Sequence, residues 1–258
     1  MKKIIAMLMV AAMVFAFAAC ATTNDLEVKE PANNDAVDTE EVADTEEVAD
    51  NTADVMSYDE YVAAELDSTV TVETYVQAKQ GWWEKDGVGV ATFYTQNEDG
   101  AFFVYEMPCS QEDYNDKLVT GAKIRVTGTK AEWSGEVEIV DATYEVLEGE
   151  YIAEAKDLTD KLGTDELINY QNQLASFKGM TVEKIEYKGG EPGDDIYVTL
   201  GYNGASYSFC VEAYLTGADT AVYTAVGNLN EGDVIDVEGF VYWYEGVNTH
   251  ITAINLAA

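Results

Sequence analysis

The stretch Gly121-Ala-Lys-Ile-Arg-Val-Thr-Gly128 decides the fold, because Gly232-Asp-Val-Ile-Asp-Val-Glu-Gly239 repeats its pattern later in the chain. Each stretch carries an isoleucine and a valine two positions apart, followed by a glycine. This alternation is typical of a β-strand with one buried face. An aromatic residue and a turn glycine follow each stretch, as Trp133-Ser-Gly135 and Tyr244-Glu-Gly246. The shared order predicts an internal duplication.

Both copies have the same order of predicted elements. The first copy has strands at residues 70–76, 88–94, 101–107, 123–128 and 137–146, with a helix within 110–118. The second has strands at 180–187, 196–200, 206–211, 234–242 and 249–256, with a helix at 219–226. Five strands with a helix between the third and fourth follow the order of the OB fold, a small closed barrel. We therefore expect an all-β fold with short helices, built as two tandem OB-fold-like five-stranded barrels.

Composition divides the chain of 258 residues into five segments. Residues 1–19 are expected to form a lipoprotein signal peptide, and 20–55 a lipidated, disordered acidic tether. Residues 56–149 form the first OB-fold-like domain, 150–164 a linker, and 165–258 the second domain. A leading helix is expected in each copy, at residues 58–66 and 165–175.

The N-terminal segment carries an export signal. Lys2 and Lys3 precede an unbroken apolar run at residues 4–17, which is shorter than the roughly 18 residues that span a bilayer. A small Ala pair then leads into Cys20. This arrangement resembles the lipobox of bacterial lipoproteins, which implies lipid attachment at Cys20 and a place on the extracellular face of the cell membrane. The alternative is an ordinary secretory signal that happens to contain Cys20.

The acidic balance limits the partners that the chain can bind. The net charge is −35, and residues 38–49 read DTEEVA twice. Low hydrophobicity with high like charge predicts a disordered spacer, although an acidic recognition tail stays open as an alternative. Nucleic-acid affinity depends mainly on Lys and Arg neutralising phosphates, so no nucleic-acid partner is expected.

Three segments carry a likeness to a known group of proteins. Residues 70–77, 123–135 and 239–246 make the chain resemble the tandem OB-fold-like lipoproteins of Gram-positive gut anaerobes. The resemblance covers most of residues 56–258 and implies the fold and the anchoring. Its motifs are structural, so it implies no activity and no catalytic residue.

The third strand of each copy alternates apolar side chains. Positions that are apolar in both copies are expected to face the barrel core: Phe103, Tyr105 and Met107 in the first copy, Tyr207, Phe209 and Val211 in the second. Phe102 and Val104 then lie on the opposite face, as an exposed or interdomain apolar patch.

Loop aromatic residues are the ligand-binding candidates. OB barrels bind ligands on the outer face of strands two and three and on the flanking loops. Rings on those loops suit sugars or peptides, and the candidates are Trp82, Trp83, Trp133, Trp243 and Tyr244. The alternative is that these rings cap the barrel ends or pack one domain on the other.

Signs of catalysis, cofactors or metals are weak. His250, the single histidine, is expected to be a hydrogen-bonded strand residue rather than a general base. No nucleophile elbow, phosphate loop or Cys/His metal spacing occurs, so no cofactor is expected. Asp194-Asp195 is the best candidate for weak calcium binding, but a solvated loop is favoured. Cys109 and Cys210 are expected to be small buried residues, with one disulfide as the alternative.

These observations predict a membrane-anchored, non-catalytic binding protein for a glycan, peptide or protein partner. A structural subunit of a cell-envelope complex is the main alternative, and single-stranded nucleic-acid binding is the weaker one.

Overall fold

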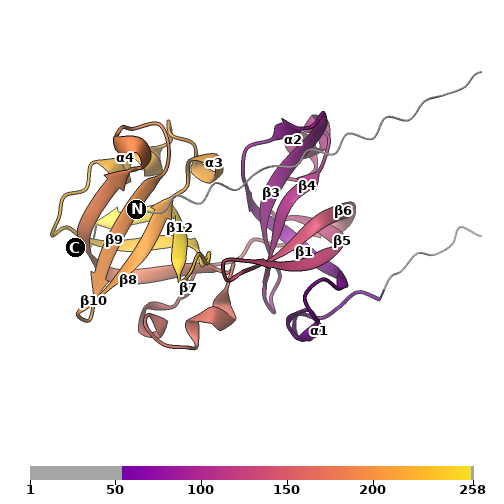
Figure 1. Ribbon diagram of the computed structural model, residues 1–258, viewed down its shortest axis with the longest axis horizontal. Helices are drawn as coiled ribbons and strands as arrows, with labels where there is room; N and C mark the ends of the chain where they lie inside the picture. The colour runs from indigo at the N-terminus through magenta and orange to yellow at the C-terminus, as the bar shows by residue number, and fades with distance from the viewer. Residues whose placement is uncertain (1–53, 257–258) are drawn as a thin grey trace, which may run out of the picture. The chain divides into compact units, whose positions relative to one another are not determined.

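The computed structural model describes residues 54–256 (Figure 1). The predicted signal peptide, Cys20 and the tether up to residue 53 lie outside the described residues, so those predictions stay untested. The described part begins with helix α1 (Tyr58–Ala63), whose N-cap Ser57 and Glu60 form a capping box. No helix of this part is both long and apolar enough to cross a bilayer.

The first barrel is a closed ring of five strands plus one short edge strand. Its elements are β1 (Thr69–Lys79), β2 (Trp83–Lys85), β3 (Val88–Gln96), β4 (Ala101–Pro108), α2 (Gln111–Asp116), β5 (Ala122–Trp133) and β6 (Glu136–Glu150). Pairing runs β1–β3–β4–β6–β5 and returns to β1. The β4–β6 pair is parallel, whereas the other pairs of the ring are antiparallel.

The second barrel repeats this ring. Its elements are β7 (Lys156–Asp157), the 3-10 turns η1 (Thr159–Lys161) and η2 (Leu167–Tyr170), β8 (Leu174–Tyr187), η3 (Lys188–Gly190), β9 (Ile196–Tyr202), β10 (Ala205–Val211), α3 (Ala213–Thr216), α4 (Ala221–Gly227), β11 (Val234–Phe240) and β12 (Asn248–Leu256). Pairing runs β8–β9–β10–β12–β11 and back to β8, again with one parallel pair, β10–β12. The predicted all-β fold of two OB-type barrels is therefore confirmed.

The duplicated stretch closes each ring as its alternation predicts. Ile124 and Val126 of β5, and Ile235 and Val237 of β11, are completely buried in the two cores. A Cβ atom at Gly239 would lie 2.2 Å from the backbone oxygen of His250. Only glycine permits this approach, so Gly239, the penultimate residue of β11, allows β11 and β12 to pair closely.

The expected linker belongs largely to the second barrel. Lys156 and Asp157 pair in parallel with β8, and Leu158 and Leu162 lie in the second core. The helix expected at residues 165–175 is wrong, because only the 3-10 turn η2 forms there and β8 already begins at Leu174.

The predicted register of β4 is also wrong. Phe102 and Val104 lie in the first core, whereas Phe103 faces the second barrel and Tyr105 is exposed. The β3–β4 hairpin encloses four residues, 97–100, whereas the β9–β10 hairpin encloses two. An alignment that matches the turn glycines therefore displaces the two copies by one residue, which moves the side chains of residues 102–105 to the other face.

Other positions of the third strand behave as expected. Glu106 adopts a positive φ of 45°, an irregularity that returns Met107 to the core. In the second copy, Phe209 and Val211 lie in the core and Tyr207 packs against it. The alternation thus predicts the buried face of β10 correctly and that of residues 102–105 in β4 wrongly.

An aromatic cluster joins the two barrels within one compact unit. It consists of Tyr94, Phe103 and Phe240, with Leu174, Leu215 and Tyr242 packed around them, and we call it the inter-barrel cluster. Tyr94 stacks on Phe240 with ring centroids 4.5 Å apart, and its hydroxyl lies 2.6 Å from His250 Nδ1. The interdomain apolar patch expected on β4 exists, but Phe103 forms it instead of Phe102.

A pair of substitutions on β4 tests this register. Phe102→Ala removes a buried ring and should lower the free energy of unfolding by about 3–5 kcal/mol. Tyr105→Ala changes an exposed residue and should alter it by no more than about 0.5 kcal/mol. Urea denaturation measures both values, and the reverse order would restore the register expected from the turn glycines.

Candidate functional site

Each barrel carries a groove on the outer face of its second and third strands. The groove on the first barrel, which we call the aromatic groove, has a volume of about 570 Å³. It is lined by Gln80, Gly81, Trp82, Trp83, Thr92, Tyr105, Glu106 and Tyr214. Tyr214 comes from α3 of the second barrel, so both halves of the chain contribute to this groove.

The two predicted tryptophans of this groove differ in role. Trp82 is half-buried, packs against the first core and donates from Nε1 to the carbonyl oxygen of Cys109 at 3.0 Å. Trp83 is 45% exposed. It lies in β2, a short strand paired with β3, rather than in the expected loop. Trp83 is therefore the ring that is free to stack on a ligand.

Two rings of the aromatic groove were missed by sequence reasoning. The alignment of the two copies by their turn glycines placed Tyr105 in the core. The unequal lengths of the β3–β4 and β9–β10 hairpins are the signal that could have corrected this placement. Tyr214 lies on a four-residue helix with no recognisable pattern. Both rings are exposed.

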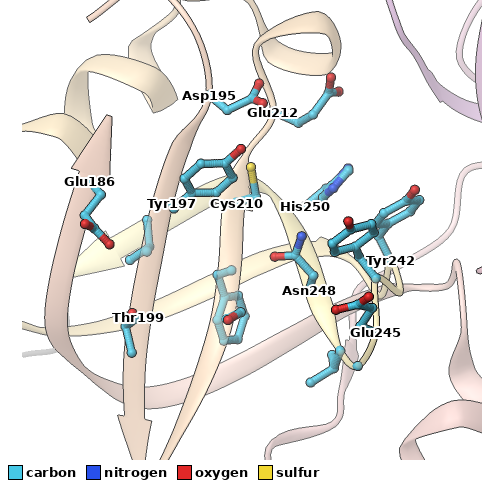
Figure 2. Close-up of a pocket in the computed structure, with 16 residues that line it drawn as sticks. Glu186, Asp195, Tyr197, Thr199, Cys210, Glu212, Tyr242, Glu245, Asn248 and His250 are labelled. Carbon is cyan, nitrogen blue, oxygen red and sulfur yellow. The ribbon is translucent and has the colours of Figure 1, made fainter. Parts of the chain in front are cut away.

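The groove on the second barrel is acidic and has a volume of about 590 Å³. We call it the acidic groove (Figure 2). Its floor comes from β9, β10 and β12, and its polar side chains include Glu186, Asp195, Tyr197, Thr199, Ser208, Glu212, Tyr242, Tyr244, Glu245, Asn248 and His250. Glu186 and Glu245 lie on opposite sides in this view, with Asp195 and Glu212 at the upper end.

Glu212 links the two grooves. Its side chain is nearly buried and accepts a hydrogen bond from Gln80 Nε2 at 3.0 Å. Burial raises the pKa of Glu212 to about 7, and the charge of Asp195 adds to the rise. Because Gln80 lines the aromatic groove and Glu212 lines the acidic groove, the two grooves meet at this hydrogen bond.

The remaining three aromatic candidates gather at the two β-hairpin ends. Trp133 of the first barrel is exposed, and its ring lies 5.2 Å from that of Tyr244, which lines the acidic groove. Trp243 packs against the second core, and a Cβ atom at Gly135 would lie 2.7 Å from its ring. Trp243 thus packs one barrel on the other, as the alternative interpretation held. The four tryptophans do not line one groove.

Glu136 is a buried carboxyl between the barrels that sequence reasoning missed. It accepts hydrogen bonds from Asn172 Nδ2 at 2.5 Å and from the backbone N–H of Trp243 at 2.9 Å. Burial nevertheless raises its pKa to about 8. Because the sequence contains 49 Asp and Glu residues, its pattern does not distinguish a buried carboxyl such as Glu136 from the exposed ones.

The other candidate residues have structural roles. His250 is buried and bonded to Tyr94, as expected of a strand residue, and burial lowers its pKa to about 3. Cys109 and Cys210 are buried free thiols, so the alternative of a disulfide is wrong.

The acidic loop of the second barrel is ion-paired rather than arranged for calcium. Lys188 Nζ lies 3.3 Å from Asp194 and 3.0 Å from Asp195. Within residues 54–256, no three carboxylate, thiol or imidazole groups converge to hold a metal ion.

Comparisons with known proteins give only distant matches. No protein-family model matches the chain, and no curated protein matches its sequence. Among solved structures, the chain is similar to a murine DNA-binding protein bound with double-stranded DNA (14% identity, 73% of this chain and 96% of that chain, TM-score 0.37). It is also similar to the Ifi202 HINa domain in complex with 20-bp double-stranded DNA (13%, 73% and 98%, 0.34). A replication protein A heterotrimer bound to single-stranded DNA matches at 12% identity, over 72% and 49%, with a TM-score of 0.30. The assignment of OB-type barrels rests on the strand pairing described above.

The buried Glu136 predicts a pH dependence of stability. A carboxyl whose pKa rises from 4.5 to about 8 on folding contributes stability below pH 4.5 that is lost as the pH rises through 8. Between pH 5 and pH 8 the free energy of unfolding should therefore fall less in Glu136→Gln than in the wild type, by on the order of 2 kcal/mol. Chemical denaturation at both pH values measures it.

The control for this prediction is Glu148→Gln, which changes an exposed carboxylate. Comparison of each variant with the wild type cancels the titration of His250, which is unchanged in all three proteins. If the free energy of unfolding of Glu136→Gln and of Glu148→Gln depends on pH as that of the wild type does, Glu136 is charged in the folded protein and the prediction is wrong.

Proposed function

We propose that the protein is a lipid-anchored, non-catalytic binding protein whose aromatic groove holds a glycan. The observation that carries this proposal is the set of three exposed rings, Trp83, Tyr105 and Tyr214, around one groove on the ligand-binding face of an OB-type barrel. The face of an exposed ring is free to stack on the C–H surface of a sugar. The side chain of Gln80 adds an amide at the edge of the groove for sugar hydroxyl groups.

The charge of the described residues supports a ligand without phosphates. Residues 54–256 hold 38 Asp and Glu against 11 Lys and Arg. Lys79 and Lys130 donate to backbone carbonyls, and Lys156 lies over the ring of Tyr170. The other eight basic side chains pair with carboxylates. Lys156 is thus the single described basic side chain without a carboxylate or carbonyl partner, which is too little positive charge to neutralise a nucleic-acid backbone.

The chemistry of the described nucleophiles supports a non-catalytic role. Burial raises the pKa of the Cys109 thiol to about 11, and the pKa of His250 falls to about 3. A thiol without thiolate character is a poor nucleophile, and a general base works best with a pKa near the operating pH.

Paired tryptophan substitutions test glycan binding. Trp83→Ala removes a ring from the aromatic groove and should weaken binding about tenfold or more, because one stacked ring contributes roughly 1–3 kcal/mol. Trp133→Ala is the matched control, since Trp133 is 53% exposed but lies outside this groove. An array of defined oligosaccharides, followed by calorimetry on any that bind, measures both.

The control should leave binding within about twofold and neither variant should change the melting temperature by much, because both rings are exposed. Equal loss in the two variants would contradict a site in the aromatic groove. If no oligosaccharide binds and mild crosslinking captures a stoichiometric protein partner, the structural subunit is favoured. Release of shortened oligosaccharides would indicate an enzyme.

The anchor has a separate test. Cys20→Ser removes the thiol that would carry the lipid, so the variant should lose incorporation of labelled palmitate and should leave the detergent-soluble membrane fraction. Metabolic labelling and fractionation of cells that produce the full chain check this. Unchanged labelling would contradict lipidation at Cys20.

A further inference from the structure

The acidic groove of the second barrel has a chemistry of its own. Its lining includes four carboxylates, from Glu186, Asp195, Glu212 and Glu245, and no Lys or Arg. Lys188 Nζ pairs with Asp194 and Asp195 at one end, and Lys184 Nζ pairs with the exposed Glu186 at 2.7 Å. Glu186 and Glu245 are exposed and stand on opposite sides of the groove in Figure 2. Counting Asp194, five carboxylates face two lysines, so negative charge is in excess along the groove. Exposed ion pairs such as Lys184–Glu186 are weak, so the complementary ligand is extended and carries several positive charges.

Aromatic rings stand between these carboxylates. Tyr197 projects from β9, and Tyr244 stands on the loop between β11 and β12. Both rings are exposed. The face of a tyrosine ring attracts ammonium and guanidinium groups, and its edge packs against their methylene stems. Rings and carboxylates together suit Lys and Arg side chains better than a compact inorganic cation.

His250 adds a buried group to the floor of the groove. The residue is only 5% exposed and lines the groove. Its Nδ1 meets the Tyr94 hydroxyl, whereas Nε2 has no hydrogen-bond partner among the described residues. If Nδ1–H donated to Tyr94, the phenol hydrogen would be buried without an acceptor. The phenol therefore donates to Nδ1, the imidazole keeps its proton on Nε2, and this N–H is available to a carbonyl oxygen.

We propose that the acidic groove binds an extended polypeptide segment rich in Lys and Arg. The carboxylates of Glu186 and Glu245 receive the basic side chains, the rings of Tyr197 and Tyr244 pack against them, and His250 Nε2–H donates to a peptide carbonyl. A polyamine supplies the positive charges but has no carbonyl, so it satisfies only part of this arrangement. The site is distinct from the aromatic groove and does not depend on glycan binding there.

Fluorescence anisotropy with labelled hexalysine and the full chain tests the proposal. Glu186→Gln combined with Glu245→Gln should weaken hexalysine binding about fivefold to tenfold, because two exposed charge pairs with the peptide are lost. Glu148→Gln combined with Glu154→Gln is the matched control: it removes the same charge from exposed residues outside the groove and should change binding by less than twofold. Binding should also weaken as salt is raised.

Each outcome decides the proposal. Equal weakening in the two double variants would mean that net charge alone attracts the peptide, and would overturn the site. Spermine binding as tightly as hexalysine would overturn the polypeptide class, and absence of hexalysine binding would overturn both. Oligosaccharide binding measured on the same variants should be unchanged, which separates this proposal from that for the aromatic groove.

Discussion

The contact of Tyr94 with the second barrel is the interaction on which the rest of the structure depends. Its ring is fully buried, stacks on Phe240 and places its hydroxyl against His250 Nδ1. A buried phenol without a partner would cost roughly 1–3 kcal/mol, so this hydrogen bond fixes the relative position of the two rings more strictly than apolar packing alone. The two barrels thus share one buried cluster, which determines how much of the outer face of each barrel stays accessible.

This cluster explains why the two grooves differ. It covers part of the outer face of β3 and β4, where Tyr94 and Phe103 lie, and leaves only the edge near Trp83 and Tyr105 open. On the second barrel it lies beside β12, and the outer face of β9 and β10 stays accessible as the acidic groove. The same barrel repeated twice therefore presents two chemically different surfaces, separated by the hydrogen bond between Gln80 and Glu212.

Burial of carboxyls at this junction is costly, and hydrogen bonds offset part of the cost. Glu136 accepts from Asn172 and Trp243, and Glu212 accepts from Gln80, yet burial raises the pKa of both groups. Removing a carboxyl from water favours its neutral form whenever no cation lies nearby. The junction thus couples the position of the barrels to the protonation of groups near the grooves.

The sequence predicted the closed rings because their signals are local. The alternation in β5 and β11 depends only on neighbours in the chain, and both stretches formed as expected. The register of β4 depends on hairpin length, which residue pattern alone does not fix, so Phe102 and Phe103 exchanged roles. The acidic groove was missed because 49 acidic residues conceal the few that converge, and Tyr214 becomes part of a site only through the contact between barrels.

Native-state hydrogen exchange of the full chain tests the shared cluster most directly. If Tyr94, Phe240 and His250 unite the barrels, amides of β3 and of β12 should exchange through one common opening with the same free energy and the same dependence on denaturant. Amides of β12 that open at a markedly lower free energy than those of β3 would show that the barrels unfold independently, and would contradict the account.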